Sequence, residues 1–558
     1  MKECFRMSQI QETIIKALEK SVNHIFQIQP EAGLLMVEEP RDRSKGDYST
    51  NVAMRLAKVL HKAPIVIAEE LVNDLKNTLP EASSIEFVKP GFINFRIKRE
   101  VLFEIINSVL KAGDKYGENT SGAGKNILVE WVSANPTGDL HCGHARNAAW
   151  GDCISNLLEK SGYNCLREFY INDAGHQIDM LGESLVARYF EWLGKDYPLP
   201  EDGYHAEDVK NIAKEILEEE GDKWLEADPK ERLEHFKLVG KKKELKKIER
   251  DLALYRVHFQ SWMPESFFYE NNMERINAVL DKMDKMNLTY EKDGALWFKA
   301  TEYGDDKDRV LRKSDGSLSY LTPDIANHVY KVERGYEHLV NLWGADHHSY
   351  VTRMKLALKA LGYPEGTLDV DIIQMVRMVE DGQEVKMSKR TGNAITLREL
   401  CEDVGVDAAR WFFVAKDVAS HMDFDFNLAR KKDNNNPVYY CQYAYTRMSS
   451  ILRKEDLPAF KPTDDFSRLT NEKELYLMKL MSEFPKLVAD AARLRKPNKV
   501  TEYILDLAKT YHSYYGMAKV NNLDDPELTN QRIGLLKALQ ITLKNAFALV
   551  GVEALEQM

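Results

Sequence analysis

The chain has 558 residues, of which 44% are hydrophobic and 30% are charged. This balance is typical of a soluble globular protein, and it excludes a disordered, collagen-like or disulfide-dense chain. At about 100 to 200 residues per domain, the length predicts three or four domains. The net charge of -11 excludes a uniformly basic surface that coats nucleic acid, but it allows a local basic face.

The same sequence predicts a cytoplasmic protein with no membrane association. No stretch approaches the ~18 uninterrupted apolar residues that a membrane span needs, and residues 1–22 have the pattern of an amphipathic helix rather than of a secretory signal. The six cysteines are spread over the whole length, and no pair has the Cys-x-x-Cys spacing of a zinc site. We therefore expect reduced thiols and no tightly bound structural metal.

Residues 1–116 predict an N-terminal α/β domain. Helical patterns such as IQETIIKALEKSVNHIF alternate there with strand-like runs such as SIEFVKPGFINFRI. The segment KYGENTSGAGKN that follows is rich in Gly, Asn, Ser and Thr, as expected of a linker between domains.

Residues 117–433 predict a Rossmann-like domain built on a parallel sheet. The buried strand ILVEWVS, the loop ANPTGDL, the helix from His141 and the strand NCLREFYIN form a βαβ unit. Strands HLVNLWGADHH and DVDIIQMVRMV are expected to supply the second half of the sheet. The helical and densely charged stretch at about 186–291 then reads as an insertion between the two halves.

Residues 434–558 are almost wholly helical in pattern. Runs such as LYLMKLMSEFPKLVADAARL and GLLKALQITLKNAFALVGV carry apolar residues at helical spacing. This predicts a C-terminal helical bundle.

The first motif that could carry chemistry is His141-Cys142-Gly143-His144, where the loop after the first strand becomes a helix. Two imidazoles three residues apart lie on one face of a helix start, where backbone N–H groups and the helix dipole favour an anion. Gly143 would let a nucleotide approach the backbone closely. Taken alone, the histidines are equally well explained as ordinary helix-cap or surface residues.

The second motif is the segment 386–393, Lys-Met-Ser-Lys-Arg-Thr-Gly-Asn. Its cations, hydroxyl groups and glycine suit a mobile loop that grips a polyphosphate, because Lys386 and Lys389 could follow charge as it moves onto a leaving group. Taken alone, the segment could also be a solvated basic loop.

Together the two motifs resemble the paired signature of class I aminoacyl-tRNA synthetases. Cys142 replaces the usual Ile of the first motif, and Arg390 replaces the usual final Ser of the second. The contexts VEWVSANPTGDLHCGHARNAAWGD and REFYINDAGHQID resemble the arginyl-tRNA synthetase family, as do SYLTPDIANHVYKVERG, WGADHH and the final Gly-Val-Glu. The resemblance covers nearly the whole chain.

That resemblance implies an arginine-tRNA ligase. Its N-terminal domain would contact the tRNA elbow, its Rossmann-like domain would form arginyl-adenylate from L-arginine and ATP, and its helical domain would read the anticodon of tRNA(Arg). The family also implies a monomer that needs tRNA for the first step. Magnesium would arrive bound to ATP, because the sequence shows no dedicated metal cage.

Site residues follow partly from chemistry and partly from the resemblance. A guanidinium needs carboxylate partners, so Glu130 and Asp324 are candidates for the arginine pocket. The resemblance adds Ser133, Asn135, Tyr320 and His347 to that pocket. It assigns catalysis to His141, His144, Lys386 and Lys389, and ATP contacts to Pro136, Gly138, His141, Gly143, His144, Met387 and Ser388. Glu130 at a strand edge, Asp324 as a helix cap and Tyr320 in a core are the structural alternatives.

The helical domain is expected to contact tRNA through a basic segment and through exposed-looking aromatic residues that could stack on splayed bases. Internal packing is the alternative for the tyrosines, since several share one helix. The basic residues are Arg493, Arg495, Lys496 and Lys499, and the tyrosines are Tyr439, Tyr440, Tyr443 and Tyr445.

Three rival functions share some of these features. A nucleotidyltransferase of the same superfamily would not need the long helical domain. A class I synthetase for another amino acid is nearer, although a cysteine enzyme would be expected to show zinc ligands. A non-catalytic tRNA-binding paralogue would have no use for both phosphate motifs.

Overall fold

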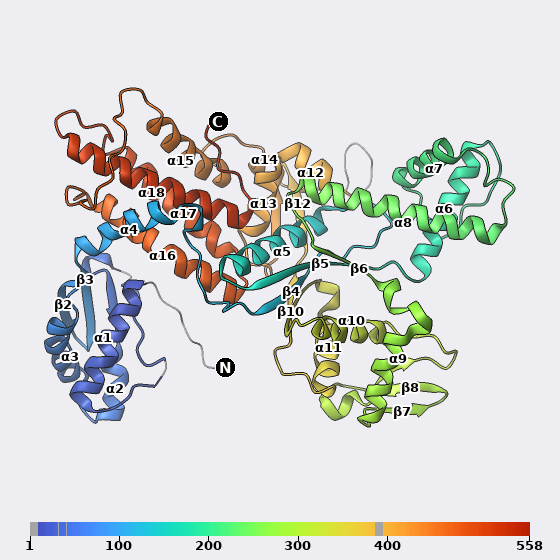
Figure 1. Ribbon diagram of the computed structural model, residues 1–558, viewed down its shortest axis with the longest axis horizontal. Helices are drawn as coiled ribbons and strands as arrows, with labels where there is room; N and C mark the ends of the chain where they lie inside the picture. The colour runs from blue at the N-terminus through green and yellow to red at the C-terminus, as the bar shows by residue number, and fades with distance from the viewer. Residues whose placement is uncertain (1–8, 32, 41, 386–393) are drawn as a thin grey trace. The chain divides into compact units, whose positions relative to one another are not determined.

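The computed structural model describes residues 9–31, 33–40, 42–385 and 394–558 (Figure 1). The chain divides into two compact units. One contains residues 1–121, 439–549 and 553–558, and the other contains residues 122–438 and 550–552. The second motif, with Lys386, Met387, Ser388 and Lys389, lies outside the described residues.

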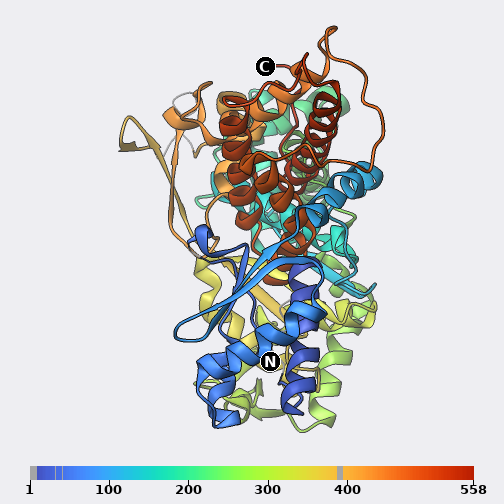
Figure 2. The same ribbon diagram turned by 90° about the vertical axis from the view of Figure 1, so that its left-hand side faces the viewer.

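The first unit begins with a small α/β domain, drawn in blue in Figures 1 and 2. Its three-stranded antiparallel sheet has the order β1-β3-β2. Apolar side chains such as Leu18, Leu71 and Phe95 are fully buried between this sheet and the helices and form one hydrophobic core. The elements are α1 (Gln9–Phe26), β1 (Tyr48–Thr50), α2 (Val52–Leu60), α3 (Pro64–Thr78), β2 (Ala82–Val88), β3 (Phe92–Ile97) and α4 (Arg99–Ala112).

The rest of the first unit is the predicted helical bundle. It consists of α15 (Pro437–Leu452), α16 (Glu472–Leu494), α17 (Asn498–Tyr515) and α18 (Pro526–Val550). By length and composition alone, α18 could cross a membrane, but 72% of its most apolar window is buried inside the protein. A core helix of a bundle explains the same composition.

The second unit is built on a five-stranded parallel sheet in the order β11-β10-β4-β5-β6. The helix α5 (Cys142–Lys160) connects β4 to β5 and is buried along most of its length, so the predicted βαβ unit is present. The strands are β4 (Asn126–Glu130), β5 (Asn164–Ile171), β6 (Ser261–Pro264), β10 (His338–Gly344) and β11 (Leu368–Ile373).

A helical insertion follows β5, as Figure 1 shows in green. It contains α6 (His176–Trp192), α7 (Glu207–Glu220) and α8 (Pro229–Leu254), after which β6 returns to the parallel sheet. The segment expected to be one insertion therefore also contains a strand of the main sheet. Short β6 has only four residues, and a run of that length carries little periodic signal.

The second unit also contains two smaller sheets and the helices around them. A small antiparallel sheet has the order β7-β8-β9, and a mixed sheet has the order β13-β12-β14. These elements are α9 (Glu270–Lys285), β7 (Thr289–Lys292), β8 (Ala295–Phe298), β9 (Arg309–Arg312), α10 (Leu321–Glu333), α11 (His348–Ala360), β12 (Val376–Glu380), β13 (Gln383–Glu384), α12 (Leu397–Val404), α13 (Val406–Val414), β14 (Met422–Asp425) and α14 (Phe426–Ala429).

The predicted strand HLVNLWGADHH ends at Gly344, where a short 3-10 helix (Ala345–His347) follows, and two further predicted strands are interrupted as well. The run ILVEWVS stops at Glu130, because Val132 and Ser133 have positive φ values of 64° and 43°, which no strand accommodates. The run DVDIIQMVRMV splits into β11 and β12, which belong to different sheets, and Met375 between them is 75% exposed. Both breaks lie at the carboxyl edge of the parallel sheet, where such folds bind ligands.

Candidate active site

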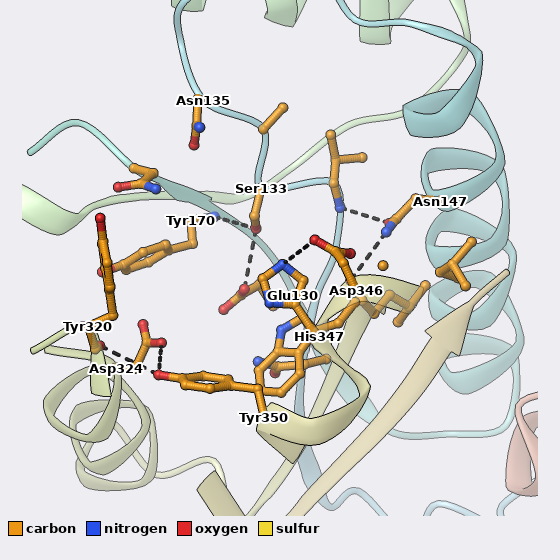
Figure 3. Close-up of a pocket in the computed structure, with 18 of the residues that line it drawn as sticks. Glu130, Ser133, Asn135, Asn147, Tyr170, Tyr320, Asp324, Asp346, His347 and Tyr350 are labelled. Atoms are coloured by element: carbon orange, nitrogen blue, oxygen red, sulfur yellow. Dashed lines mark hydrogen bonds and ion pairs between the residues drawn. The ribbon is translucent and has the colours of Figure 1, made fainter. Parts of the chain in front are cut away.

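A cavity of about 1360 Å³ opens at the carboxyl ends of β4 and β10 (Figure 3). The predicted arginine-pocket residues all line it: Glu130, Ser133, Asn135, Tyr320, Asp324 and His347. His141, Gly143 and His144 line it as well. Pro136 and Gly138 stand on the same loop as Asn135 but do not line the cavity.

The left-handed turn after β4 places Ser133 between two strands. The backbone N–H of Val132 donates to Oδ1 of Asn147 at 2.8 Å, which fixes the turn against α5. Ser133 Oγ donates to Glu130 Oε1 at 3.3 Å and accepts the backbone N–H of Tyr170 at 3.1 Å. The hydroxyl is therefore held by β4 and β5 at the floor of the cavity.

Glu130 is not a free carboxylate. Its Oε2 forms a buried ion pair with Nζ of Lys331 on α10, whose side chain is fully buried. Lys331 also lies 3.6 Å from Glu168, which accepts from Arg334 Nη1 at 2.6 Å. Because a protein cation already neutralises Glu130, this residue is a weaker guanidinium partner than its sequence context suggested.

Unlike Glu130, the carboxyl groups of Asp324 and Glu265 have no ion-pair partner among the residues described. Both carboxylates line the cavity. Burial raises the pKa of Asp324 to about 6, although the Tyr350 hydroxyl lowers it. Burial and the charge of Asp324 raise the pKa of Glu265 to about 7. The charge of Lys331 also lowers the pKa of Asp324, but Lys331 forms its ion pairs with Glu130 and Glu168. Asp324 and Glu265 therefore remain carboxyl groups that no ion pair compensates, and they form a site that attracts an organic cation.

Hydrogen bonds orient these carboxyl groups. The Tyr350 hydroxyl donates to Asp324 Oδ2 at 2.5 Å, as Figure 3 shows, and the Tyr269 hydroxyl donates to Glu265 Oε1 at 3.2 Å. The ring of Tyr320 stands at the cavity mouth and is 89% exposed, an unusual state for a large aromatic side chain. The exposure leaves its face open to a ligand.

Glu265 was not among the residues expected from the sequence. It begins the short 3-10 helix η3 (Glu265–Phe268) directly after β6, inside the stretch expected to be an insertion. A strand prediction for SWMP would have placed a carboxylate at the carboxyl end of a sheet strand, which is the signal that could have identified it. Asn135 Nδ2 donates to Oε1 of Gln177 at 2.5 Å, and Gln177 itself does not line the cavity.

The predicted histidine pair caps α5. Nδ1 of His141 accepts the backbone N–H of Gly143 at 3.1 Å, and Nδ1 of His144 accepts the backbone N–H of His141 at 3.2 Å. Each neutral ring therefore carries its proton on Nε2 and can donate from that atom. The ring centroids are 3.9 Å apart. A Cβ at Gly143 would approach Cε1 of His141 at 2.9 Å, so glycine leaves room for the ring.

The histidines are neutral near pH 7. Burial, together with the neighbouring His141 ring, lowers the pKa of His144 to about 3. Burial also lowers the pKa of His141. Cys142 points away from this face, since its Sγ contacts the carbonyl of Ile395 at 3.4 Å and the side chain is buried.

The chain that leaves segment 386–393 runs directly beside the histidine motif. The backbone N–H of Cys142 donates to Ile395 O at 3.1 Å, and that of Leu397 donates to Leu140 O at 2.7 Å. Thr396 then caps α12 with its side chain. These bonds tether the chain that follows the second motif to the first motif.

The predicted tRNA contacts lie in the first unit. Tyr439 and Tyr443 stack with centroids 6.4 Å apart, and Arg447 Nη2 donates to the Tyr443 hydroxyl at 3.0 Å. Both tyrosines are half-buried. Tyr445 is buried, so the expectation of an exposed side chain was wrong there: it lies on the inward face of α15.

The predicted basic segment spans the end of α16, the turn that follows and the start of α17. Arg493 is exposed and pairs with Asp490 at 3.4 Å, while Arg495 ends α16 in a left-handed conformation. Lys496 and Lys499 are half-buried. No group of three or more His, Cys, Asp or Glu side chains that could hold a metal occurs among the residues described.

Three family models match the chain in order. They are the arginyl-tRNA synthetase N-terminal domain at residues 8–97, the class I (R) tRNA synthetase catalytic domain at residues 105–467 and the DALR anticodon binding domain at residues 441–558.

Curated relatives and solved structures agree with these models. The chain is 49% identical over 552 residues to arginine–tRNA ligase 1 of Halalkalibacterium halodurans, covering 99% of this chain and 98% of the relative. It is 49% identical over 526 residues to arginine–tRNA ligase of Bacillus subtilis, covering 94% of each. A putative arginyl-tRNA synthetase structure from Campylobacter jejuni matches with a TM-score of 0.76 at 32% identity, over 83% of this chain and 100% of that one. A Thermus thermophilus arginyl-tRNA synthetase shares the fold, with a TM-score of 0.75 at 22% identity over 98% and 100%. The chain thus belongs to the arginyl-tRNA synthetase family of class I aminoacyl-tRNA synthetases.

Proposed function

We propose that this chain is an arginine–tRNA ligase whose cavity binds L-arginine at Asp324 and Glu265. The carboxylate of arginine attacks the α-phosphorus of ATP, arginyl-adenylate forms and pyrophosphate leaves. The terminal ribose hydroxyl of tRNA(Arg) then takes the arginyl group and releases AMP. Family membership and the two uncompensated carboxylates support this assignment.

The guanidinium group lies between Asp324 and Glu265. Burial keeps water from screening these carboxylates, so a planar cation with paired N–H donors gains more from them than a solvated ion would. Tyr320 covers the apolar stem of the substrate at the cavity mouth. Ser133, Asn135 and His347 hold its α-amino and carboxylate end, and Glu130 acts on them through Ser133.

The nucleotide lies over the start of α5. Nε2–H donors of His141 and His144 stabilise charge that develops on the phosphates, and Lys386 and Lys389 act from the other side. Pro136, Gly138, Gly143, Met387 and Ser388 complete the ATP site. Magnesium comes with ATP, because that ion is typically bound through substrate phosphates. No covalent enzyme intermediate is needed, so catalysis rests on in-line positioning and on charge stabilisation.

For tRNA we propose the domain roles implied by the family. The N-terminal domain contacts the elbow, and the helical domain reads the anticodon through Tyr439, Tyr443, Arg493, Arg495, Lys496 and Lys499. Stacked, half-buried rings beside cations are well suited to splayed bases. The protein acts as a cytoplasmic monomer.

Pyrophosphate exchange with ATP tests this function. Each amino acid is supplied singly, with and without total tRNA. Exchange with arginine alone, and only when tRNA is present, is the expected result. Exchange with a different amino acid would contradict the proposed pocket, and tRNA binding without any exchange would favour a non-catalytic paralogue.

A further inference from the structure

One face of helix α8 contacts the loop that leads into the histidine motif. Nζ of Lys247 lies 3.1 Å from Oδ1 of Asp139, which precedes His141 by two positions. Lys247 belongs to the helical insertion, whereas Asp139 belongs to the loop between β4 and α5. An ion pair therefore connects the insertion to the loop between β4 and α5, which we call the nucleotide loop because it leads into the histidine motif.

Lys247 sits in a cluster of three carboxylates. Its Nζ is 2.7 Å from Asp208 on α7, 2.7 Å from Glu244 on α8 and 3.1 Å from Asp139. The Glu244 side chain is fully buried and that of Lys247 is 16% exposed. Burial opposes the charge of Lys247, but the three carboxylates outweigh it and raise its pKa. Removing this ammonium would leave three acids facing one another, and Asp139 is the one on a loop that can move away.

The same face of α8 contacts the segment that follows the second motif. Asp251, one turn after Lys247, accepts from Arg398 Nη2 at 2.5 Å and from its Nε at 3.2 Å. Arg398 stands in the first turn of α12, whose preceding residues are tethered to Leu140 and Cys142. One helical turn of α8 thus contacts the loop before the first motif and the helix that follows the second.

We propose that Lys247 and Asp251 are positioning residues for adenylate formation. This inference rests on the proposed function and assigns a role to the insertion. Lys247 holds Asp139 so that His141 meets the phosphates, and Asp251 holds Arg398 so that the chain after the second motif has a fixed anchor. Misplacement of a reacting group by about 1 Å can cost two orders of magnitude in rate.

A matched control distinguishes a positioning role of these ion pairs from a purely structural one. Lys243 lies on the same helix, is 19% exposed and pairs with Glu215 at 2.9 Å and Glu219 at 2.7 Å. Both of its partners are on α7, so Lys243→Met removes a comparable ion pair within the insertion and leaves the nucleotide loop untouched.

The test measures tRNA-dependent pyrophosphate exchange by the full chain over a range of arginine concentrations, which gives both kcat and the KM for arginine. We expect Lys247→Met to lower kcat by about 10- to 100-fold with the KM for arginine unchanged, because positioning acts mainly in the transition state. Lys247→Arg should restore most of the rate, and Lys243→Met should stay within about twofold of wild type. If Lys247→Met and Lys243→Met show equal rates, the positioning role is contradicted.

Two further variants keep the test decisive if Lys247→Met fails to fold. Asp139→Asn changes a loop side chain that is 39% exposed, and Arg398→Gln changes one that is 38% exposed. Each should lower kcat without changing the KM for arginine, and Asp139→Asn should add little to Lys247→Met. Full activity of both single variants would overturn the inference. Absence of exchange by the wild-type chain would instead contradict the proposed function.

Discussion

The hydroxyl of Tyr350 donates to Oδ2 of Asp324 at 2.5 Å, so the carboxylate proposed for the substrate guanidinium is already aimed before arginine enters. Tyr350 stands on α11 and Asp324 on α10, which places the donor and the acceptor on two different packed helices. A carboxylate held in this way needs little reorganisation on binding.

Tyr350→Phe should raise the KM for arginine by about tenfold, because a hydrogen bond to a charged group contributes about 1.5 kcal/mol or more. The KM for ATP should change little, since the hydroxyl faces the arginine side of the cavity. Steady-state exchange rates at varied arginine and varied ATP provide both values. Equal increases in the two constants would count against an arginine-specific role for Tyr350.

Glu265 and Glu130 should respond differently to the same substitution. Glu265→Gln should weaken arginine binding by at least tenfold with little loss of stability, because no protein cation depends on that charge within the described chain. Glu130→Gln should destabilise the fold by about 3 kcal/mol or more, because buried Lys331 loses its nearest carboxylate and keeps Glu168, at 3.6 Å, as its ion-pair partner within the described chain.

Isothermal titration with arginine and thermal unfolding measure these two effects. Glu207→Gln serves as the control, since its side chain on α7 is 74% exposed and does not line the cavity. A large loss of arginine affinity in Glu130→Gln protein that melts like wild type would reverse the assignment of the two glutamates.

Arginine affinity should rise with pH between about 5.5 and 8. The pKa values of Asp324 and Glu265 are raised to about 6 and about 7, so both groups lose their charge as the pH falls through those values. A bound guanidinium favours the charged forms and lowers both pKa values, so binding near pH 6.5 should release protons.

Titration of arginine in buffers with different ionisation enthalpies counts those protons. Arginine binding to Glu265→Gln should release fewer protons than binding to the wild type, which would identify the Glu265 carboxyl group as one source of these protons. Affinity that is constant across this pH range would show that neither carboxyl group titrates in contact with the ligand.

His144→Asn should lower kcat by about 100-fold and leave the KM for arginine nearly unchanged, because its Nε2–H donor serves developing phosphate charge. Burial holds the pKa of His144 near 3, so the ring is neutral throughout the working range. At saturating arginine the wild-type kcat should therefore not change between pH 6 and 8 through titration of this imidazole. Rates at a series of pH values test this expectation. A pH dependence of kcat that is present in the wild type and lost in His144→Asn would contradict the assignment of His144 as a neutral donor.

Local patterns predicted those parts of the site whose chemistry is contiguous in sequence. The βαβ unit, the histidine cap of α5 and Asp324 on α10 all follow from short runs. Contacts between residues that lie far apart in the sequence could not be predicted from such runs. Lys331 neutralises Glu130 from a position 201 residues away, and Glu265 enters the cavity through a strand of four residues. How strongly each carboxylate can bind the substrate cation depends on such distant partners, and the periodicity of the sequence carries no information about them.

Lys389 belongs to the second phosphate motif. Lys389→Ala should slow adenylate formation by about 100-fold or more while changing arginine affinity less than threefold, because a cation that follows charge onto pyrophosphate acts mainly in the transition state. Single-turnover formation of adenylate gives the rate, and arginine titration gives the affinity. Lys355→Ala is a suitable control, since that lysine stands on α11, is 45% exposed and does not line the cavity. Losses of equal size in rate and in arginine affinity would show that Lys389 contributes to ground-state binding and not to the transfer of charge.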